Sequence, residues 1–261
     1  MRPGEPSITA RRVAAQRLAF PRVPVEGGGA AADDLLAADV AGELAGGPPG
    51  PMARYLAART AFFDRVVVGA LDGGVGQIAI VGAGYDGRPL RYARAGVRWF
   101  EVDHPDTQAD KRERLARLGI EAGHVAFVPA DLATTDVGPA LLAGGLDRSR
   151  RCLFVCEGLL VYLERAVIDR LLAGLRAVAA PGSRLALSVS VATESGEGRE
   201  RREQFARRVA AVGEPARTVL EPSEAEQLLD RTGWSVGGAR GTASDRGRAA
   251  GLIVAAAASA A

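Results

Sequence analysis

Short apolar runs and amphipathic stretches alternate along most of the chain. The apolar runs, which are typical of parallel strands buried on both faces, are residues 77–81, 97–102, 125–128, 152–156, 184–189 and 252–255. The stretches with helical periodicity between them lie at about 88–95, 106–118, 136–144, 165–179 and 223–232. This alternation predicts an α/β fold, in which helices cover both faces of a doubly wound sheet.

Two further regions flank or interrupt this alternation. Helices are expected at residues 8–20, about 33–45 and 52–70, separated by proline- and glycine-rich joints. The segment 191–220 is polar and longer than a simple connection, and we expect a helix at about 199–212 that covers the site. The predicted organisation is therefore a helical cap (1–74), a cofactor-binding core (75–190), a lid insertion (191–220) and a C-terminal part that completes the sheet (221–261).

Composition excludes several classes of protein. The chain has 261 residues, 48% hydrophobic and 25% charged, which is typical of a globular protein. It contains no apolar stretch of the length that a membrane span needs. The net charge is +2, and the basic residues alternate with acids instead of forming the one-sided stripe of a nucleic-acid binder. We therefore expect neither membrane nor nucleic-acid partners.

The cysteines and histidines argue against disulfides and metal. Cys152 and Cys156 lie four positions apart in a predicted strand, about 13 Å, which is too far for a disulfide. They indicate a reduced, cytoplasmic protein. With only two histidines, His104 and His124, a structural zinc site is not expected, and we assign no metal ligands.

Acidic residues follow the predicted strands. Asp86 lies in the turn after the first strand, Asp103 ends the second, Asp131 follows the third and Glu157 follows the fourth. In open α/β sheets, ligands bind at the carboxyl ends of the strands. Any one acid could be a solvated strand end, but four in equivalent positions repel each other unless a ligand supplies donors or positive charge. The pattern therefore predicts a cationic ligand at this edge.

The first turn contains the pattern G-x-G-x-x-G, formed by Gly82, Gly84 and Gly87. Asp103 lies 21 residues beyond Gly82, where an acid binds ribose hydroxyls. Both nicotinamide enzymes and class I methyltransferases share these features. The pattern alone therefore leaves two candidate cofactors open.

Asp86 helps to separate the two candidates. A carboxylate in this turn would repel a pyrophosphate, whereas S-adenosylmethionine has an ammonium, a sulfonium and no phosphate. Lys111 is the only lysine, and no Tyr-x-x-x-Lys pattern for hydride transfer is present. S-adenosylmethionine is favoured, and an NAD(P)-dependent oxidoreductase is the alternative.

Five phrases occur together in a specific order and spacing. They are Arg59-Thr60-Ala61-Phe62-Phe63-Asp64, residues 81–88, residues 100–105 with Lys111-Arg112 following, residues 129–132, and residues 156–163. In this order they resemble the leucine carboxyl methyltransferase family, over roughly residues 7–190. The closer likeness is to its bacterial branch, which includes carboxyl O-methyltransferases of aromatic polyketide pathways such as the tetracenomycin one. The resemblance implies the Rossmann-like, mostly parallel seven-stranded sheet of class I methyltransferases.

The resemblance also implies which residues bind S-adenosyl-L-methionine. Arg59 would pair with the carboxylate of the cofactor, because arginine makes charge-assisted and often bidentate bonds. The turn residues Gly82, Ala83 and Gly84 would lie against its methionyl part. Asp86 and Glu157 would face its positive groups.

On the adenosine side, Asp103 would accept from both ribose hydroxyls and Asp131 from the adenine amino group. Leu132 would lie against the adenine ring, and His104 would flank it. Among these assignments Glu157 is also next to the substrate. Together with Tyr162, which would line the substrate side, it is our candidate for a catalytic role.

Methyl transfer from a sulfonium mainly requires alignment of the reacting atoms and exclusion of water. An ionised carboxylate needs no general base, which agrees with the scarcity of His, Cys and Lys, whereas a phenol would need one. The resemblance therefore implies an O-methyltransferase for a small-molecule acceptor. We expect a carboxylate or acidic hydroxyl of a bacterial secondary metabolite such as a polyketide. A repurposed member that binds the cofactor without transferring methyl is a further alternative, and the oligomeric state is left open.

Overall fold

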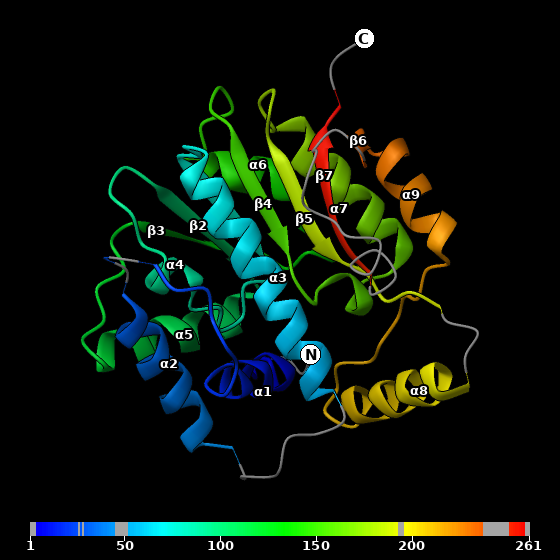
Figure 1. Ribbon diagram of the computed structural model, residues 1–261, viewed down its shortest axis with the longest axis horizontal. Coiled ribbons are helices and arrows are strands. Elements are labelled where there is room, and N and C mark those ends of the chain that lie inside the picture. Colours follow the sequence, from blue (N-terminus) through cyan, green and yellow to red (C-terminus); the bar gives the residue numbers. More distant parts are fainter. Residues whose placement is uncertain are drawn as a thin grey trace.

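A seven-stranded sheet runs through the middle of the protein (Figure 1). The computed structural model describes residues 4–25, 27, 29–44, 52–192, 196–236 and 251–258. The strands are β1 (Gln77–Val81), β2 (Arg98–Asp103), β3 (Val125–Pro129), β4 (Cys152–Cys156), β5 (Arg184–Ser188), β6 (Trp234–Ser235) and β7 (Leu252–Ala257). Their order is β3-β2-β1-β4-β5-β7-β6, and only β7 runs antiparallel to its neighbours β5 and β6. The predicted mostly parallel, doubly wound sheet is confirmed.

The order of the strands reverses at β1, which pairs with β2 on one side and with β4 on the other. Ligand sites in open α/β sheets lie at such a switch point, beyond the carboxyl ends of the strands. Residues that follow β1, β2 and β4 are therefore brought to one place by the topology.

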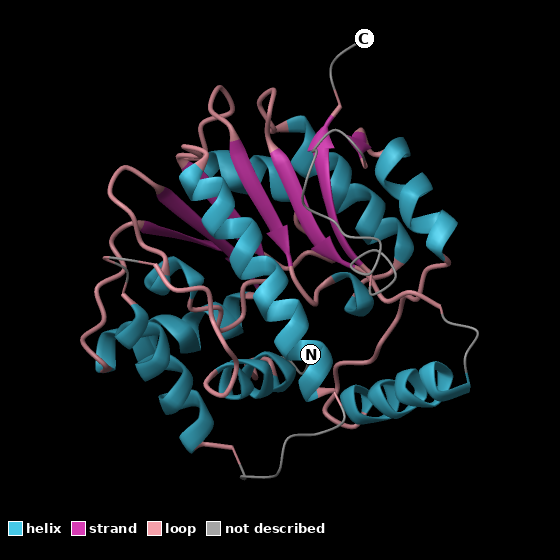
Figure 2. Ribbon diagram, viewed as in Figure 1, coloured by secondary structure: helices cyan, strands magenta, loops and turns pink. Residues whose placement is uncertain are grey.

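Helices cover both faces of the sheet (Figure 2). They are α1 (Ile8–Arg17), α2 (Ala30–Gly42), α3 (Ala53–Asp72), α4 (Arg88–Arg91), α5 (Pro105–Arg117), α6 (Val137–Ala143), a 3-10 helix η1 (Leu160–Tyr162), α7 (Arg165–Ala177), α8 (Gly196–Ala210) and α9 (Pro222–Arg231). Helix α3 packs on one face, and α6, α7 and α9 pack on the other. None of the helices in the described part of the chain has the length and hydropathy of a membrane span.

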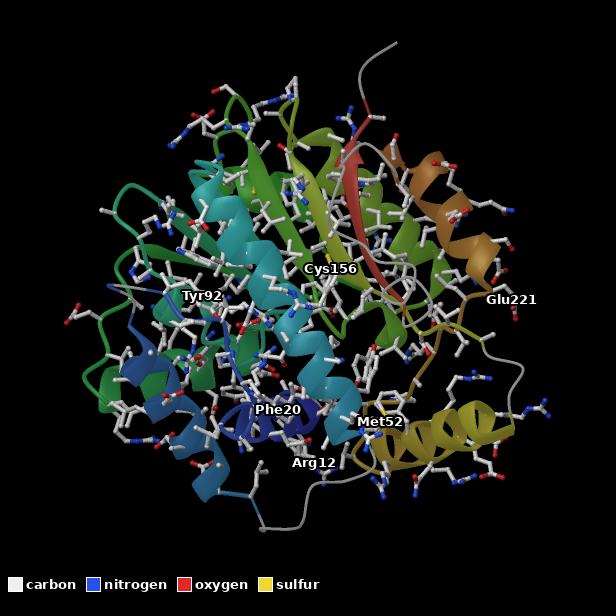
Figure 3. The ribbon with its side chains drawn as sticks, viewed as in Figure 1. Arg12, Phe20, Met52, Tyr92, Cys156 and Glu221 are labelled. Carbon is white, nitrogen blue, oxygen red and sulfur yellow. The ribbon has the colours of Figure 1, made fainter. Side chains whose placement is uncertain are left out.

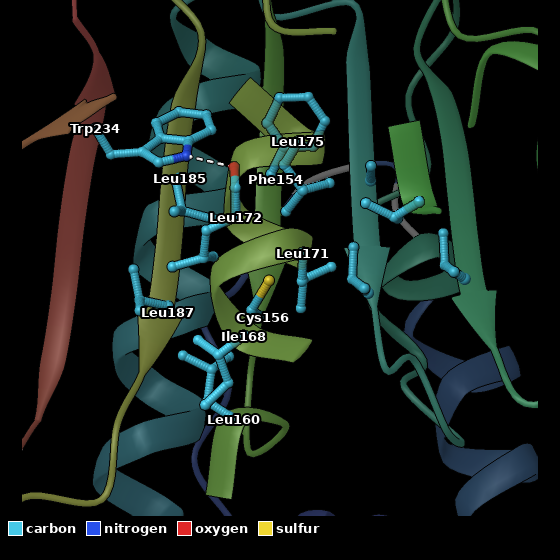
Figure 4. Close-up of a cluster of buried hydrophobic side chains, with 14 of the residues drawn as sticks. Phe154, Cys156, Leu160, Ile168, Leu171, Leu172, Leu175, Leu185, Leu187 and Trp234 are labelled. Atoms are coloured by element: carbon cyan, nitrogen blue, oxygen red, sulfur yellow. Dashed lines mark hydrogen bonds between the residues drawn. The ribbon is translucent and has the colours of Figure 1, made fainter. Parts of the chain in front are cut away.

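The two faces use alternate residues of each strand, because successive side chains point to opposite sides. In β4, Leu153 and Val155 pack against α3, whereas Phe154 and both cysteines pack in the core under α7 (Figure 4). Both cysteines are free, and both are buried on the same side of the strand. Trp234 closes this core, and its indole Nε1 donates to the carbonyl of Leu172 at 3.0 Å.

The remaining helices gather beyond the carboxyl ends of β1, β2 and β4, at the lower edge of the sheet in Figure 1. Residues of α1, α2, α4 and α5 form a third apolar cluster there, which includes Ala14, Leu36, Leu90 and Leu115. Helix α8 lies on the same side. These helices position the candidate site.

Several boundaries differ from the sequence prediction. The helix expected at 88–95 ends at Arg91, where Tyr92 leaves the helical conformation (φ −108°, ψ 23°), and the chain turns again at Gly96 (φ +77°) before β2. The first helix ends at Arg17 instead of continuing to residue 20, and α8 begins at Gly196, three residues before the expected start. Strand β6 has only two residues, too few for a pattern to predict. The division into cap, core, lid and C-terminal part stays a prediction.

Candidate functional site

The glycine turn after β1 needs its glycines for two reasons. Gly82 and Gly84 have φ angles of +69° and +51°, which are unfavourable for other residues. A Cβ atom at Gly82 would lie 2.8 Å from the Leu159 side chain, and one at Gly84 would lie 2.8 Å from Cβ of Ala10 in α1. The backbone amides of Gly82 and Ala83 donate to the carbonyl of Val102, so the turn folds over the end of β2.

Asp103 ends β2 directly beneath this turn. Its Oδ2 accepts from the Gly84 amide at 2.6 Å, and its Oδ1 accepts from the His104 amide at 2.7 Å. Burial raises the pKa of Asp103, although both amides favour the ionised form. His104 caps α5, since its Nδ1 accepts from the Asp106 amide. The predicted ribose acid is thus next to the turn.

Glu157, which follows β4, is surrounded by three arginines. Its Oε2 accepts from Arg88 Nη1 at 2.6 Å and lies 3.1 Å from Arg17 Nη2. Its Oε1 accepts from Arg59 Nε at 2.9 Å. Burial alone would raise the pKa of Glu157, but Arg88, Arg17 and Arg59 hold it well below its usual range. The carboxylate is therefore ionised at neutral pH.

Asp86 lies beside Glu157 and shares two of its partners. It accepts from the Arg88 amide at 2.9 Å and from Arg88 Nη1 at 2.6 Å, and Arg17 Nη2 is 3.5 Å away. Burial opposes ionisation, yet Arg17 and Arg88 lower the pKa of Asp86. The repulsion that we expected between these acids is thus relieved by arginines of the chain itself.

The arginines extend into a buried network that joins α2, α3 and α4. Arg88 Nε donates to Asp64 at 2.7 Å, and Arg22 donates to Asp64 at 2.6 Å and to Asp33 at 2.8 Å. Burial would raise the pKa of Asp64, but Arg88 and Arg22 lower it to about 2. Buried charges are tolerated only when they are paired in this way.

Sequence reasoning placed only Arg59 in the site and missed Arg17, Arg22 and Arg88. Arg88 stands in one of the phrases that carry the family resemblance, which was a usable signal. Arg17 and Arg22 lie in and just after the first helix, and nothing in the pattern distinguishes them from the other arginines of the chain.

Arg59 itself keeps donors for an anion. Its Nε donates to Glu157, whereas its two terminal nitrogens make no hydrogen bond with the described residues. The guanidinium lies over the Tyr55 ring, 5.7 Å from its centroid. A Cβ atom at Gly158 would lie 3.0 Å from Arg59 Nη1, so the absence of a side chain at this glycine leaves space for the Arg59 guanidinium. A carboxylate ligand could bind to these nitrogens.

Tyr162 lies where α1 meets the segment after α8. Burial raises the pKa of Tyr162, and its ring is 6.4 Å from that of Phe205. Glu214 accepts from the Ile8 amide at 2.8 Å and from the Ser7 hydroxyl at 3.0 Å, next to the start of α1. The helical cap and the predicted lid are therefore tied together over this side of the site.

Asp131 and Leu132 lie at the outer rim, after β3. Asp131 is exposed, and its Oδ1 accepts from the Ala133 amide at 2.9 Å. Leu132 is partly buried against the core. The Ala130 amide donates to the carbonyl of Asp103 at 2.8 Å, so this loop adjoins the ribose acid. The structure brings Arg59 into contact with Glu157, and Asp86 shares Arg88 with Glu157; the adenine candidates lie farther along the edge.

Lys111, the only lysine, anchors the glycine turn from below. Its Nζ donates to both oxygens of Glu101 at 2.7 and 2.8 Å and to the carbonyl of Asp86 at 2.7 Å. Burial raises the pKa of Glu101 from 4.5 to about 7, although Lys111 opposes this shift. Both residues are buried, and both stand in one of the phrases that carry the family resemblance, which was a usable signal.

This pKa predicts a pH dependence of stability. Between pH 4.5 and about 7, unfolded Glu101 is ionised while the folded chain retains the proton. The free energy of unfolding should therefore fall as pH rises through this window, by on the order of 3 kcal/mol for this group. Urea titrations of wild type and Glu101→Gln at several pH values measure it. The variant should lose this part of the slope, and identical slopes would contradict the assignment.

The chain is similar to methyltransferases in sequence and in fold. A family model described as leucine carboxyl methyltransferase matches residues 14–176. A protein from Mycobacterium sp. (strain KMS), named "Putative S-adenosyl-L-methionine-dependent methyltransferase", is 38% identical over 180 residues, covering 67% of this chain and 58% of the relative. The matched part of the chain thus spans less than two thirds of that relative. A similarly named protein from Mycolicibacterium paratuberculosis is 33% identical over 215 residues, covering 78% of this chain and 69% of the relative.

A solved structure shares the fold over nearly the whole chain. It is that of a "putative methyltransferase" from Thermobifida fusca YX, with a TM-score of 0.60 and 19% identity, covering 98% of this chain and 96% of that one. A second, from Streptomyces avermitilis, has a TM-score of 0.57 and 17% identity, covering 96% and 97%. At these identities the likeness concerns the fold.

Proposed function

The chain belongs to the leucine carboxyl methyltransferase family, and from this premise we propose that it is an S-adenosyl-L-methionine-dependent O-methyltransferase. Its acceptor is proposed to be the carboxylate of a small molecule. We place it in the cytoplasm of a bacterium, in the synthesis of a secondary metabolite such as a polyketide acid. One observation supports the proposal most strongly. Arg59 is bonded to Glu157 at the end of β4, and Asp103 is bonded to the neighbouring glycine turn.

The donor and acceptor groups at this edge fit the proposed cofactor. The two terminal nitrogens of Arg59 suit a carboxylate, and the ionised Glu157 suits an ammonium. Asp103 has lone pairs beyond its two backbone bonds and suits ribose hydroxyls. S-adenosylmethionine has these three kinds of group: a carboxylate and an ammonium at one end, and the hydroxyls of a ribose beyond them.

The other predicted contacts extend along the same edge. Gly82, Ala83 and Gly84 would border the methionyl part, with Asp86 holding Arg88 behind Glu157. The adenine candidates are His104, Asp131 and Leu132. Their roles remain predictions that a bound S-adenosylhomocysteine would test.

When bound, the cofactor would supply a methyl group on positive sulfur. Its transfer to a carboxylate oxygen would form a C–O bond, break the C–S bond with the electron pair left on sulfur, and move no proton. The protein has to align and desolvate the acceptor. Glu157, with its lowered pKa, is a poor base, and Tyr162, with its raised pKa, stays protonated at neutral pH. These two residues support an acceptor that is already ionised, as a carboxylate is.

Calorimetry with S-adenosylhomocysteine and NAD tests the proposal. We expect micromolar or tighter binding of S-adenosylhomocysteine and no measurable binding of NAD. Labelled S-adenosylmethionine with a panel of aromatic polyketide acids then tests transfer. NAD binding without S-adenosylhomocysteine binding would favour an oxidoreductase, and cofactor binding without transfer to any acid would favour a repurposed member.

A further inference from the structure

Lys111 makes three hydrogen bonds inside the protein, as many as its ammonium can donate. Its side chain is 2% exposed, and its Nζ donates to both carboxylate oxygens of Glu101 and to the backbone carbonyl of Asp86. Glu101 alone would supply the charge partner that a buried ammonium requires. The bond to Asp86 goes beyond this pairing, because it ties helix α5 to the glycine turn that follows β1.

These bonds form a closed ring with the candidate ribose acid. Glu101 and Asp103 are two positions apart in β2, so their side chains point to the same side of the sheet. Asp103 accepts from the Gly84 amide at 2.6 Å, and Gly84 is two residues before Asp86 in the turn. Lys111 closes the ring, with 2.7 Å to Glu101 and 2.7 Å to Asp86. Strand β2 and the glycine turn are thus joined at two points.

The base of the Lys111 side chain is anchored as well as its tip. Gln108 lies three residues earlier on the same face of α5. It is buried, and its Nε2 donates to the backbone carbonyl of Glu101 at 3.0 Å. Two side chains of α5 therefore hold this helix against β2, and the position of the Lys111 ammonium is set by the helix.

Lys111 also acts on the charge of Asp103. Burial raises the pKa of Asp103, and Lys111 opposes this shift together with the two backbone amides and His104. Hydrogen bonds to an ionised carboxylate are stronger than those to a neutral acid. The same lysine thus supports both the position and the charge of the acid next to the glycine turn.

We propose that Lys111 is a positioning residue for the cofactor, which acts through Asp103 and does not touch the ligand. By fixing Asp103 against the glycine turn, it prepares the carboxylate for the ribose hydroxyls before the cofactor binds, and such preorganisation raises affinity. The inference rests on the proposed function, since it takes Asp103 as the ribose acid. A lysine that only stabilised the fold would affect all ligands of the site alike.

Calorimetry with S-adenosylhomocysteine and its 2′,3′-dideoxy analogue, which lacks both ribose hydroxyls, tests the proposal. Wild type should bind S-adenosylhomocysteine about a hundredfold more tightly than the analogue, as expected for two hydrogen bonds to a carboxylate. Lys111→Met should reduce this ratio to about tenfold, because a displaced Asp103 loses the equivalent of one bond. Arg12→Met is the matched control, since Arg12 lies on the helix that packs against Gly84 but is exposed (Figure 3). It should keep the ratio of wild type.

The ratio of the two affinities separates the outcomes. An equal loss for both ligands in Lys111→Met, with the ratio unchanged, would show a structural role only and overturn the proposal. Equal binding of both ligands by wild type would refute Asp103 as the ribose acid, and the role of Lys111 with it. Failure of wild type to bind S-adenosylhomocysteine would reject the proposed function itself.

A second variant keeps the test decisive if Lys111→Met does not fold by circular dichroism. Glu101→Leu combined with Lys111→Met removes both members of the buried pair, and apolar replacement of a whole pair is often neutral or stabilising. This double variant also lacks the bond to Asp86, so it should show the same reduced ratio. A ratio equal to that of wild type in the double variant would overturn the proposal.

Discussion

Arg88→Met should lower the free energy of unfolding by about 3–5 kcal/mol, the cost of removing one partner from a buried charge pair. Arg88 is fully buried and donates to Asp64, Asp86 and Glu157. Methionine has a similar length but no charge, so three carboxylates would lose a donor without gaining water. Urea denaturation followed by circular dichroism measures the loss.

The loss should also depend on pH. Protonated acids need no guanidinium, so the difference between wild type and Arg88→Met should shrink as pH falls and the carboxylates take up protons. Arg94→Met is the matched control, because Arg94 and its partner Asp72 are both exposed, and such pairs contribute about 0–1 kcal/mol. A penalty at neutral pH no larger than that of Arg94→Met would show that the network does not depend on Arg88.

Asp103→Ala should weaken S-adenosylhomocysteine binding about a hundredfold. Two hydrogen bonds from ribose hydroxyls to a carboxylate contribute roughly 1.5 kcal/mol each, and together these correspond to two powers of ten. Asp103→Asn keeps one acceptor oxygen and should lie between the two. Calorimetry of the folded variants gives the affinities.

Asp72→Ala serves as control for Asp103→Ala, since Asp72 lies at the exposed C-terminal end of α3. It should bind S-adenosylhomocysteine as wild type does. The Gly84 amide loses its acceptor in Asp103→Ala, so near-ultraviolet circular dichroism should be compared first. A variant that folds and binds with unchanged affinity would refute the ribose assignment.

The fold and the place of the site followed from local pattern. Runs such as 152–156 are apolar at every position because both faces of the central strands are buried, and this marks them without an alignment. Parallel strands bring their carboxyl ends together, so Asp103 and Glu157 could be placed at one edge from strand order alone.

The partners of these acids could not be predicted in the same way. Arg17 and Glu157 are 140 positions apart, and Arg22 and Asp64 are 42 apart. Such pairs depend on how α1 and the segment after it cross the edge of the sheet, and the sequence shows only that both carry arginines among many others.

The bond between Glu214 and the start of α1 has a consequence for synthesis of the chain. Ile8 and Glu214 are separated by 206 positions, and Ser7 and Glu214 by 207. At a ribosomal rate of about 5–20 residues per second, Glu214 is made roughly ten seconds or longer after α1, whose first residues it bonds. Until then the central strands can already pair, since their contacts lie much closer along the chain. Helix α1 is therefore held by Glu214 only after strands β1 to β5 have been made, and this side of the site is completed after the central sheet.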